Sequence, residues 1–119
     1  MVCRNYCVKE DYTIKETLEV IDANKDRVVV VTGKEDKVVG IVSQGDILRA
    51  LVGGGDFYAR VATIVKPSFL YLKEKDMERA YEIFKKTQIT MLPVVDEQYQ
   101  LMDVITLKDI YKYLEERRG

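Results

Sequence analysis

The sequence predicts an α+β domain, with strands and helices alternating in the α/β manner, built from two copies of one unit. Residues 38–51 show this most clearly: a short β-branched run ends at Ser43, and apolar residues at helical spacing follow it. The change of period predicts a strand that leads directly into a helix. The same pattern returns 63 residues later, over residues 103–114.

The repeat keeps its register along the chain, which indicates an internal duplication. Ser43 corresponds to Thr106, and Asp46 corresponds to Asp109. Further pairs at the same offset are Ile14 with Met77, Val20 with Ile83, Ile21 with Phe84, and Val31 with Val94. A unit of about 60 residues is marginal on its own, so we expect the two units to share one core.

The first unit is predicted to run strand, helix, strand, turn, strand, helix. Its expected elements are a strand at 6–8, a helix over 14–24, strands at 28–31 and 38–43, and a helix after 43. Asp11 or Thr13 can cap the first helix. The run Val28–Val31 is continuous and β-branched, which is typical of a strand buried on both faces.

Three glycines, Gly53–Gly55, follow the second expected helix. Glycine ends helices readily because it enters the left-handed conformation without steric cost. A phosphate-binding loop is the alternative, but no strand precedes these glycines and no Lys-Ser or Lys-Thr pair follows them. We therefore interpret them as a helix end and the start of a linker.

The second unit is predicted to repeat the same order. Its expected elements are a short strand at 69–72, a helix capped by Asp76, a buried strand within 89–96, a strand leading into Thr106, and a final helix over 110–114. The apolar stripe of the Asp76 helix, which includes Ala80 and Phe84, is interpreted as core.

Composition excludes several classes of function. The 19 basic and 20 acidic side chains leave a net charge of −1, which gives no broad electrostatic footprint for nucleic acid. No apolar run approaches the roughly 20 residues of a membrane span, and the N-terminus lacks the pattern of a signal peptide. We expect a cytoplasmic location.

The residue types in the sequence give little support for a catalytic site or a metal site. The chain has no histidine, and its two cysteines, Cys3 and Cys7, cannot close a zinc site alone, although a metal shared across a dimer stays open. Cys7 is interpreted as a small buried residue, and no role is predicted for Cys3. Without an activated nucleophile or a close carboxylate pair outside solvated turns, we expect no enzyme and no required cofactor.

Two short polar motifs have a local explanation as well as a functional one. Ser43-x-x-Asp46 and Thr106-x-x-Asp109 are ordinary capping boxes, worth about 0.5–2 kcal/mol to their helices without any ligand. Arg27 is equally compatible with a solvated turn. A ligand-binding role for any of these residues therefore needs further support.

The duplicated unit resembles a known family. Two strand-helix-strand-strand-helix copies, a Leu92-Pro93-Val94-Val95-Asp96 strand and a Gly40-Ile41-Val42-Ser43-x-x-Asp46-Ile47 junction are similar to a tandem pair of cystathionine-β-synthase (CBS) domains, the Bateman module. The resemblance covers the whole chain. It implies two small three-stranded mixed sheets that meet about a pseudo-twofold axis, with four flanking helices. It places one repeat at residues 1–55, a linker at 56–68 and the other repeat at 69–119.

The same resemblance implies a function. Members bind adenosyl compounds such as AMP, ADP, ATP or, less in keeping here, S-adenosylmethionine in clefts between the repeats, and they regulate an attached enzyme, channel or transporter. Asp46 and Asp109 would be the ribose-binding acids, and Ser43 and Thr106 the hydroxyls near phosphate. This is chemically reasonable, because a carboxylate accepts ribose hydroxyls and a helix N-terminus suits a phosphate.

Each cleft in the family borrows residues from the other repeat. By resemblance, the cleft of Ser43 and Asp46 would add Arg27 toward phosphate, Ile41 under the base, the linker from Ile64 to Phe69, and the pair Ile89 and Thr90. The cleft of Thr106 and Asp109 would add Val104, the segment from Val2 to Tyr6, and the backbone near Asp26 and Arg27.

The sequence also departs from the family pattern. Gly40 fits it, but its counterpart Asp103 adds a side chain and a negative charge beside the second cleft. We therefore expect the cleft of Ser43 and Asp46 to be the better nucleotide site. Phe69 and Tyr6 are large for a base-binding wall and are able to close either pocket.

Two functions from different classes agree with these features. The first is a nucleotide-sensing regulatory module that controls a fused or partner domain. The second is a ligand-free scaffold whose exposed helices stack two pairs into a homodimer. The sequence around residues 45–51, followed by a glycine-bearing linker, also resembles pairs attached to sugar-phosphate nucleotidyltransferases.

Overall fold

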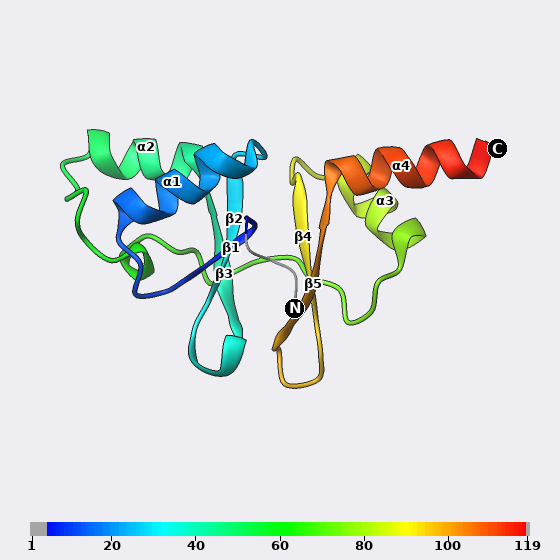
Figure 1. The fold of residues 1–119 in the computed structure, drawn as a ribbon, viewed down its shortest axis with the longest axis horizontal. Coiled ribbons are helices and arrows are strands. Elements are labelled where there is room, and N and C mark those ends of the chain that lie inside the picture. The colour runs from blue at the N-terminus through cyan, green and yellow to red at the C-terminus, as the bar shows by residue number, and fades with distance from the viewer. Residues whose placement is uncertain (1–4, 119) are drawn as a thin grey trace.

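The computed structural model describes residues 5–118, which form two halves that lie side by side (Figure 1). The first half contains β1 (Cys7–Lys9), α1 (Ile14–Asn24), β2 (Val28–Thr32), a 3-10 turn (Lys34–Asp36), β3 (Val38–Ser43) and α2 (Gln44–Val52). A linker with a 3-10 turn at Val61–Thr63 leads to the second half, which contains α3 (Met77–Lys86), β4 (Met91–Val95), β5 (Leu101–Thr106) and α4 (Leu107–Arg118). The α+β class is confirmed.

The duplication is confirmed in the backbone. Each of α3, β4, β5 and α4 begins 63 residues after its counterpart in the first half. The strand registers match as well: Val28 pairs with Ser43, and Met91 pairs with Thr106. Even the irregularity in each antiparallel pair falls at the equivalent place, after Val31 and after Val94. The two halves are therefore two folded copies of one unit.

The second sheet is smaller than expected. The first sheet has the order β1-β2-β3, with β1 parallel and β3 antiparallel to β2, whereas the second contains only β4 and β5. The strand expected at residues 69–72 was wrong in extent, because only Leu72 forms a parallel bridge, to Val94. In the first half, Val8 pairs with Val31, the counterpart of Val94. The residue equivalent to Val8 is Tyr71, so the buried residue that pairs in the second half, Leu72, lies one position later in the repeat. The link from the bridged residue to the next helix is shorter by one residue, and the second half has one bridged pair where β1 makes three.

The hydrophobic core has three layers, and the middle one joins the halves. Strands β2 and β4 are buried along their whole length. Side chains alternate between the two faces of a strand, so Val28 and Val30 enter the middle layer while Val29 and Val31 face α1 and α2. The middle layer contains Val28, Val30, Val38, Met91, Val95, Leu101 and Val104. The shared core expected for two marginal units is therefore present.

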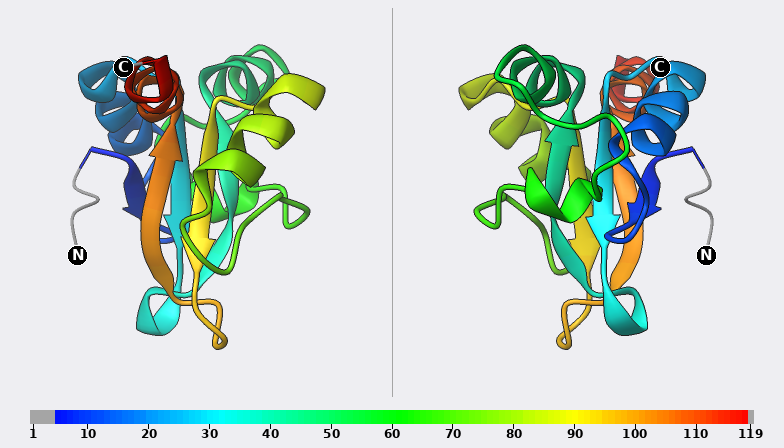
Figure 2. Two further views of the ribbon diagram at one scale, coloured as in Figure 1. Left: turned by 90° about the vertical axis from the view of Figure 1, so that its right-hand side faces the viewer. Right: turned by 90° about the vertical axis from the view of Figure 1, so that its left-hand side faces the viewer.

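The helices lie toward one end of the strands, and the β2–β3 and β4–β5 hairpin turns lie at the other (Figures 1 and 2). At the hairpin end, Lys37 forms an antiparallel bridge with Gln100, its own counterpart 63 residues later. The Gln100 Nε2 group donates to the Glu35 carbonyl at 2.9 Å, and the Val38 amide donates to the Tyr99 carbonyl at 2.9 Å. Two equivalent residues that pair with each other lie on either side of the pseudo-twofold axis, so the axis passes between Lys37 and Gln100.

The linker crosses β3 at Gly40. Ile41 forms a bridge with Lys66, and a Cβ atom placed on Gly40 would lie 2.4 Å from the Lys66 carbonyl oxygen. Only glycine allows two backbones to approach this closely. Before the linker, Gly53 donates to the Arg49 carbonyl at 3.0 Å, and Gly55 donates to the Ala50 carbonyl at 2.8 Å. The interpretation of these glycines as a helix end is therefore confirmed.

Two further features complete the fold. Thr13 caps α1 with a capping box, as one of the two predicted candidates, and Asp76 caps α3 as predicted. Cys7, predicted to be buried, is half-buried beside the middle layer, and its sulfur is in a disulfide, whereas Cys3 lies outside the described residues. Across residues 5–118, none of the helices has the length and apolar content that spanning a membrane requires.

We expect Gly40→Ala to destabilise the fold by about 1–3 kcal/mol, because the added methyl group would overlap the Lys66 backbone. Urea unfolding of the variant and the wild type measures this difference. Gly45→Ala is the matched control, since the nearest atom to a Cβ there is 3.4 Å away and the site is helical. An unchanged free energy of unfolding for Gly40→Ala would contradict the close approach.

Candidate functional site

The junction of β3 and α2 holds Ser43 and Asp46 in a reciprocal capping box. The Ser43 amide donates to Asp46 Oδ2 at 2.9 Å, and the Asp46 amide donates to the Ser43 hydroxyl at 3.1 Å. This geometry follows from a strand that ends in an extended cap residue with an acid three positions later. The local explanation of the motif is therefore confirmed.

The second carboxylate oxygen of Asp46 contacts two cations. Arg49 Nη2 lies 2.6 Å from Asp46 Oδ1, and Lys66 Nζ lies 3.4 Å from the same atom. Burial raises the pKa of Asp46, but the hydrogen bonds from Ser43 and Arg49 and the charge of Lys66 outweigh burial, so the pKa lies below its ordinary value of 3.8. Asp46 is thus a carboxylate at neutral pH with both oxygens engaged.

The junction of β5 and α4 repeats the box with one difference. The Thr106 amide and hydroxyl donate to Asp109 Oδ2 at 2.8 Å and 3.1 Å, and the Asp109 amide approaches the Thr106 hydroxyl at 3.4 Å. Among the described residues, nothing donates to Asp109 Oδ1. The two acids are therefore equivalent in position but differ in the state of their second oxygen.

Arg27 and its counterpart Thr90 lie just before the buried strands β2 and β4, and both are exposed. Arg27 has a left-handed backbone, with φ of 65°, and its carbonyl accepts the Gln44 amide at 2.9 Å. The backbone of Arg27 is thus adjacent to the start of α2. A role for its side chain in anion binding stays a prediction.

The apolar residues predicted for the two clefts separate into groups. Ile41, Phe69 and Tyr6 are half-buried against the middle layer, and Val104 is part of that layer. Ile64 instead packs in the core of the first half, and Ile89 packs in that of the second. The structure therefore brings four of these six residues to the contact between the sheets. The part of the Val2–Tyr6 segment before residue 5 lies outside the described residues.

Two charged residues near Asp46 were not named among the predicted site residues, although one of them, Lys66, lies in the linker from Ile64 to Phe69 that was placed at this cleft. Arg49 has the helical i, i+3 spacing from Asp46, which was a usable signal. Lys66 has no such signal, because it reaches Asp46 only through the bridge between the linker and β3. The negative charge of Asp103, predicted to face the second cleft, is paired with Lys75 Nζ at 3.2 Å.

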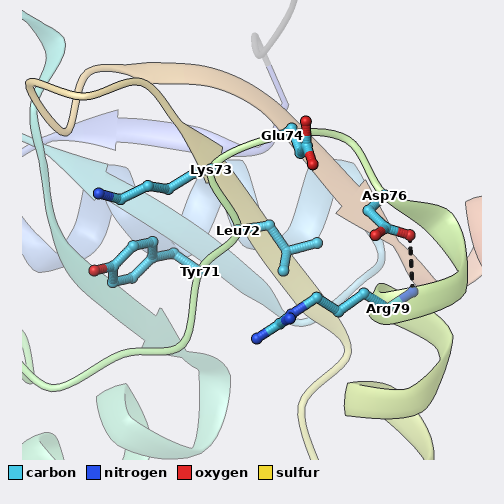
Figure 3. Close-up of a pocket in the computed structure, with 6 residues that line it drawn as sticks. All are labelled: Tyr71, Leu72, Lys73, Glu74, Asp76 and Arg79. Carbon is cyan, nitrogen blue, oxygen red and sulfur yellow. Dashed lines mark hydrogen bonds between the residues drawn. The ribbon is translucent and has the colours of Figure 1, made fainter.

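A separate depression of about 480 Å³ lies at the start of the second half (Figure 3). It is lined by Tyr71, Leu72, Lys73, Glu74, Asp76 and Arg79. None of the predicted site residues lines it. A hydrogen bond to Tyr99 raises the pKa of Tyr71, and the Asp76 carboxylate accepts the Arg79 amide at 3.0 Å as the cap of α3. Within residues 5–118, no group of acidic, histidine or cysteine side chains forms a metal site.

Comparison with protein families identifies the class of this domain. A family model described as CBS domain matches residues 1–53 and residues 61–116. The two matches together cover nearly the whole chain, so the chain belongs to the CBS domain family and is a tandem CBS pair. CBS pairs are regulatory modules.

Solved structures of other CBS pairs share the fold. A CBS domain pair/ACT domain protein from Thermotoga maritima is 27% identical, with a TM-score of 0.79 over 96% of this chain and 91% of that chain. A CBS domain protein from Pyrobaculum aerophilum, solved in complex with AMP, is 24% identical, with a TM-score of 0.73 over 93% and 91% of the two chains.

A third relative is the magnesium transporter MgtE. The Thermus thermophilus protein is 35% identical over 57 residues, which is 47% of this chain and 13% of that protein. The structure of the cytosolic domain of MgtE in complex with ATP gives a TM-score of 0.72 at 25% identity, over 92% of this chain and 45% of that chain. This chain therefore spans only a small part of the transporter that it matches.

The lowered pKa of Asp46 predicts a pH-dependent contribution to stability. Because the folded pKa lies below that of the unfolded chain, the contribution is complete above about pH 4 and is lost as the pH falls through the folded pKa. We expect the wild type to be more stable than Asp46→Asn at pH 7 and the difference to shrink toward pH 2.5. Urea unfolding across that range measures it, and a constant difference would contradict the interpretation.

Proposed function

We propose that this domain senses an adenine nucleotide and passes the signal to a fused or partner domain in the cytoplasm, without catalysis of its own. The observation that carries the proposal is the pair of hydroxyl–carboxylate junctions, Ser43 with Asp46 and Thr106 with Asp109, at the N-termini of α2 and α4. Each offers an acid for a ribose and the positive end of a helix dipole for a phosphate. The AMP complex of the Pyrobaculum protein and the ATP complex of MgtE support the ligand class.

The proposed ligands are AMP, ADP and ATP, ahead of S-adenosylmethionine. Arg27, Arg49 and Lys66 all lie near the start of α2, and they favour a ligand that carries negative phosphates over one that carries a sulfonium charge. Ile41 and Phe69 provide apolar surface for a base beside the middle layer. We keep the cleft of Ser43 and Asp46 as the stronger nucleotide site for this reason.

Regulation requires the ligand to bind two arrangements of the halves differently. The halves are joined by the middle core layer and by the hairpin contact between Lys37 and Gln100. A ligand between them is able to change their relative angle while each half keeps its own outer core. The boundaries proposed for these moving parts are residues 1–55 and 69–119, with 56–68 as the linker.

We expect AMP, ADP or ATP to raise the melting temperature by several degrees at a hundred times its dissociation constant, since such binding adds about 2.7 kcal/mol. Thermal shift with these ligands, S-adenosylmethionine and GTP measures the effect. Asp46→Ala and Asp109→Ala should each reduce the ligand-induced shift, whereas Asp22→Ala, which removes an exposed acid of α1, should not. No shift with any adenosyl compound would favour the ligand-free scaffold.

The scaffold function has its own support in α2 and α4. Leu48 and Val52 are 54% and 88% exposed on α2, and Tyr111, the counterpart of Leu48 on α4, is 58% exposed. Apolar residues at equivalent places on two helices suit an interface with a second copy of the chain. We propose that these helices form a homodimer, which is compatible with either function.

If α2 and α4 form this interface, Leu48→Glu should convert a dimer to a monomer, because a charge would be buried without a partner. Sedimentation equilibrium measures the mass directly. Leu70→Glu is the matched control, because Leu70 is 46% exposed but lies outside these helices. A dimer that tolerates Leu48→Glu, or a wild type that is monomeric, would exclude the interface.

A further inference from the structure

The two acids of the repeat differ in what surrounds their second oxygen. Asp46 Oδ1 is approached by Arg49 at 2.6 Å and by Lys66 at 3.4 Å. Asp109 Oδ1 has no such contact from the described residues. Both acids use their other oxygen in the same way, to accept the amide of the cap residue. The two acids therefore differ at Oδ1, which is the carboxylate oxygen not used by the cap and so the one that remains for a ligand.

The two cations beside Asp46 come from α2 and from the linker, and neither has an equivalent ion pair at Asp109 among the described residues. The counterpart of Arg49 is Lys112, which is exposed and makes no ion pair among the described residues. The counterpart of Lys66 is Cys3, which carries no positive charge. Among residues 5–118, two cations therefore lie over Asp46, and no ion pair forms over Asp109.

The backbone positions Lys66 beside Asp46, but the side chains of Lys66 and Arg49 are exposed and able to pair with another anion. The linker holds Lys66 through its bridge to Ile41, above the glycine that lets the two strands approach. The Arg49 and Lys66 side chains are 70% and 69% exposed, whereas the Asp46 side chain is only 13% exposed. Exposed cations are easily drawn to another anion, while the carboxylate beneath them is reached only when they move.

We propose that Arg49 and Lys66 form a cationic cover that makes the first cleft selective for phosphorylated nucleosides. A phosphate near the start of α2 gives both cations a new anionic partner and releases Asp46 for the ribose hydroxyls. A neutral nucleoside offers no such partner, so it must compete with two cations for the carboxylate. Within the described residues the second cleft has no such pair of cations at Asp109, and it accepts a nucleoside with or without phosphate.

This inference rests on the proposed function, and it is tested by titrating the ¹⁵N-labelled chain with adenosine and with AMP. The amides of Gly45 and Lys108, which are counterparts at the starts of α2 and α4, report on the two clefts separately. In the wild type, AMP should shift both signals, whereas adenosine should shift Gly45 only at concentrations at least tenfold above those that shift Lys108.

The variant Arg49→Gln/Lys66→Gln removes the cover and, because both side chains are exposed, should keep the fold. Adenosine should then shift Gly45 and Lys108 at similar concentrations, and AMP should bind the first cleft several-fold more weakly. Lys112→Gln, the matched control at the position equivalent to Arg49, should leave both ligands unchanged.

The outcomes separate the two proposals. If AMP binds but adenosine occupies the wild-type first cleft equally well, or if the double variant leaves the preference for AMP unchanged, the cover is rejected and the sensor function stands. If neither AMP nor adenosine shifts either amide, adenine-nucleotide sensing fails and the cover fails with it.

Discussion

The contact between the inner faces of the two sheets is the constraint on which the rest of the structure depends. Strands β2 and β4 consist almost wholly of buried apolar residues, so each needs a partner on both of its faces. The helices of each half cover one face, and the other half covers the second. Because the strand registers are fixed by these faces, the two junctions that carry Ser43 and Thr106 are held in equivalent positions.

Symmetry of the backbone does not make the two junctions chemically alike. The linker crosses β3 at Gly40 and brings Lys66 to Asp46, whereas the equivalent position in the second half is Asp103, which pairs with Lys75. The connection between the halves thus adds Lys66 to the cation that α2 already provides, Arg49, and among the described residues Asp109 has no ion pair of this kind. The two copies are therefore distinguished both by the linker between them and by single side chains, such as Arg49 in place of Lys112.

Most of the fold could be predicted from the sequence, because its signals are local. The change of period at Ser43, the capping pairs three residues apart and the β-branched run at Val28–Val31 each define an element without reference to the rest of the chain. The extent of the strand at residues 69–72 could not be predicted, because a shift of one residue decides how many backbone pairs form. The contact of Lys66 with Asp46 was equally hidden, since it depends on where the linker crosses the sheet.

The bridge between Lys37 and Gln100 has a mechanical consequence. It lies at the hairpin end of the molecule, on the pseudo-twofold axis, and α2 and α4 lie toward the opposite end (Figure 1). If this bridge stays intact while the two halves rotate relative to each other, it acts as a hinge, and the displacement of each residue grows with its distance from the bridge. A rotation too small to disturb the middle core layer would then be largest at the outer helices, where another chain would detect it.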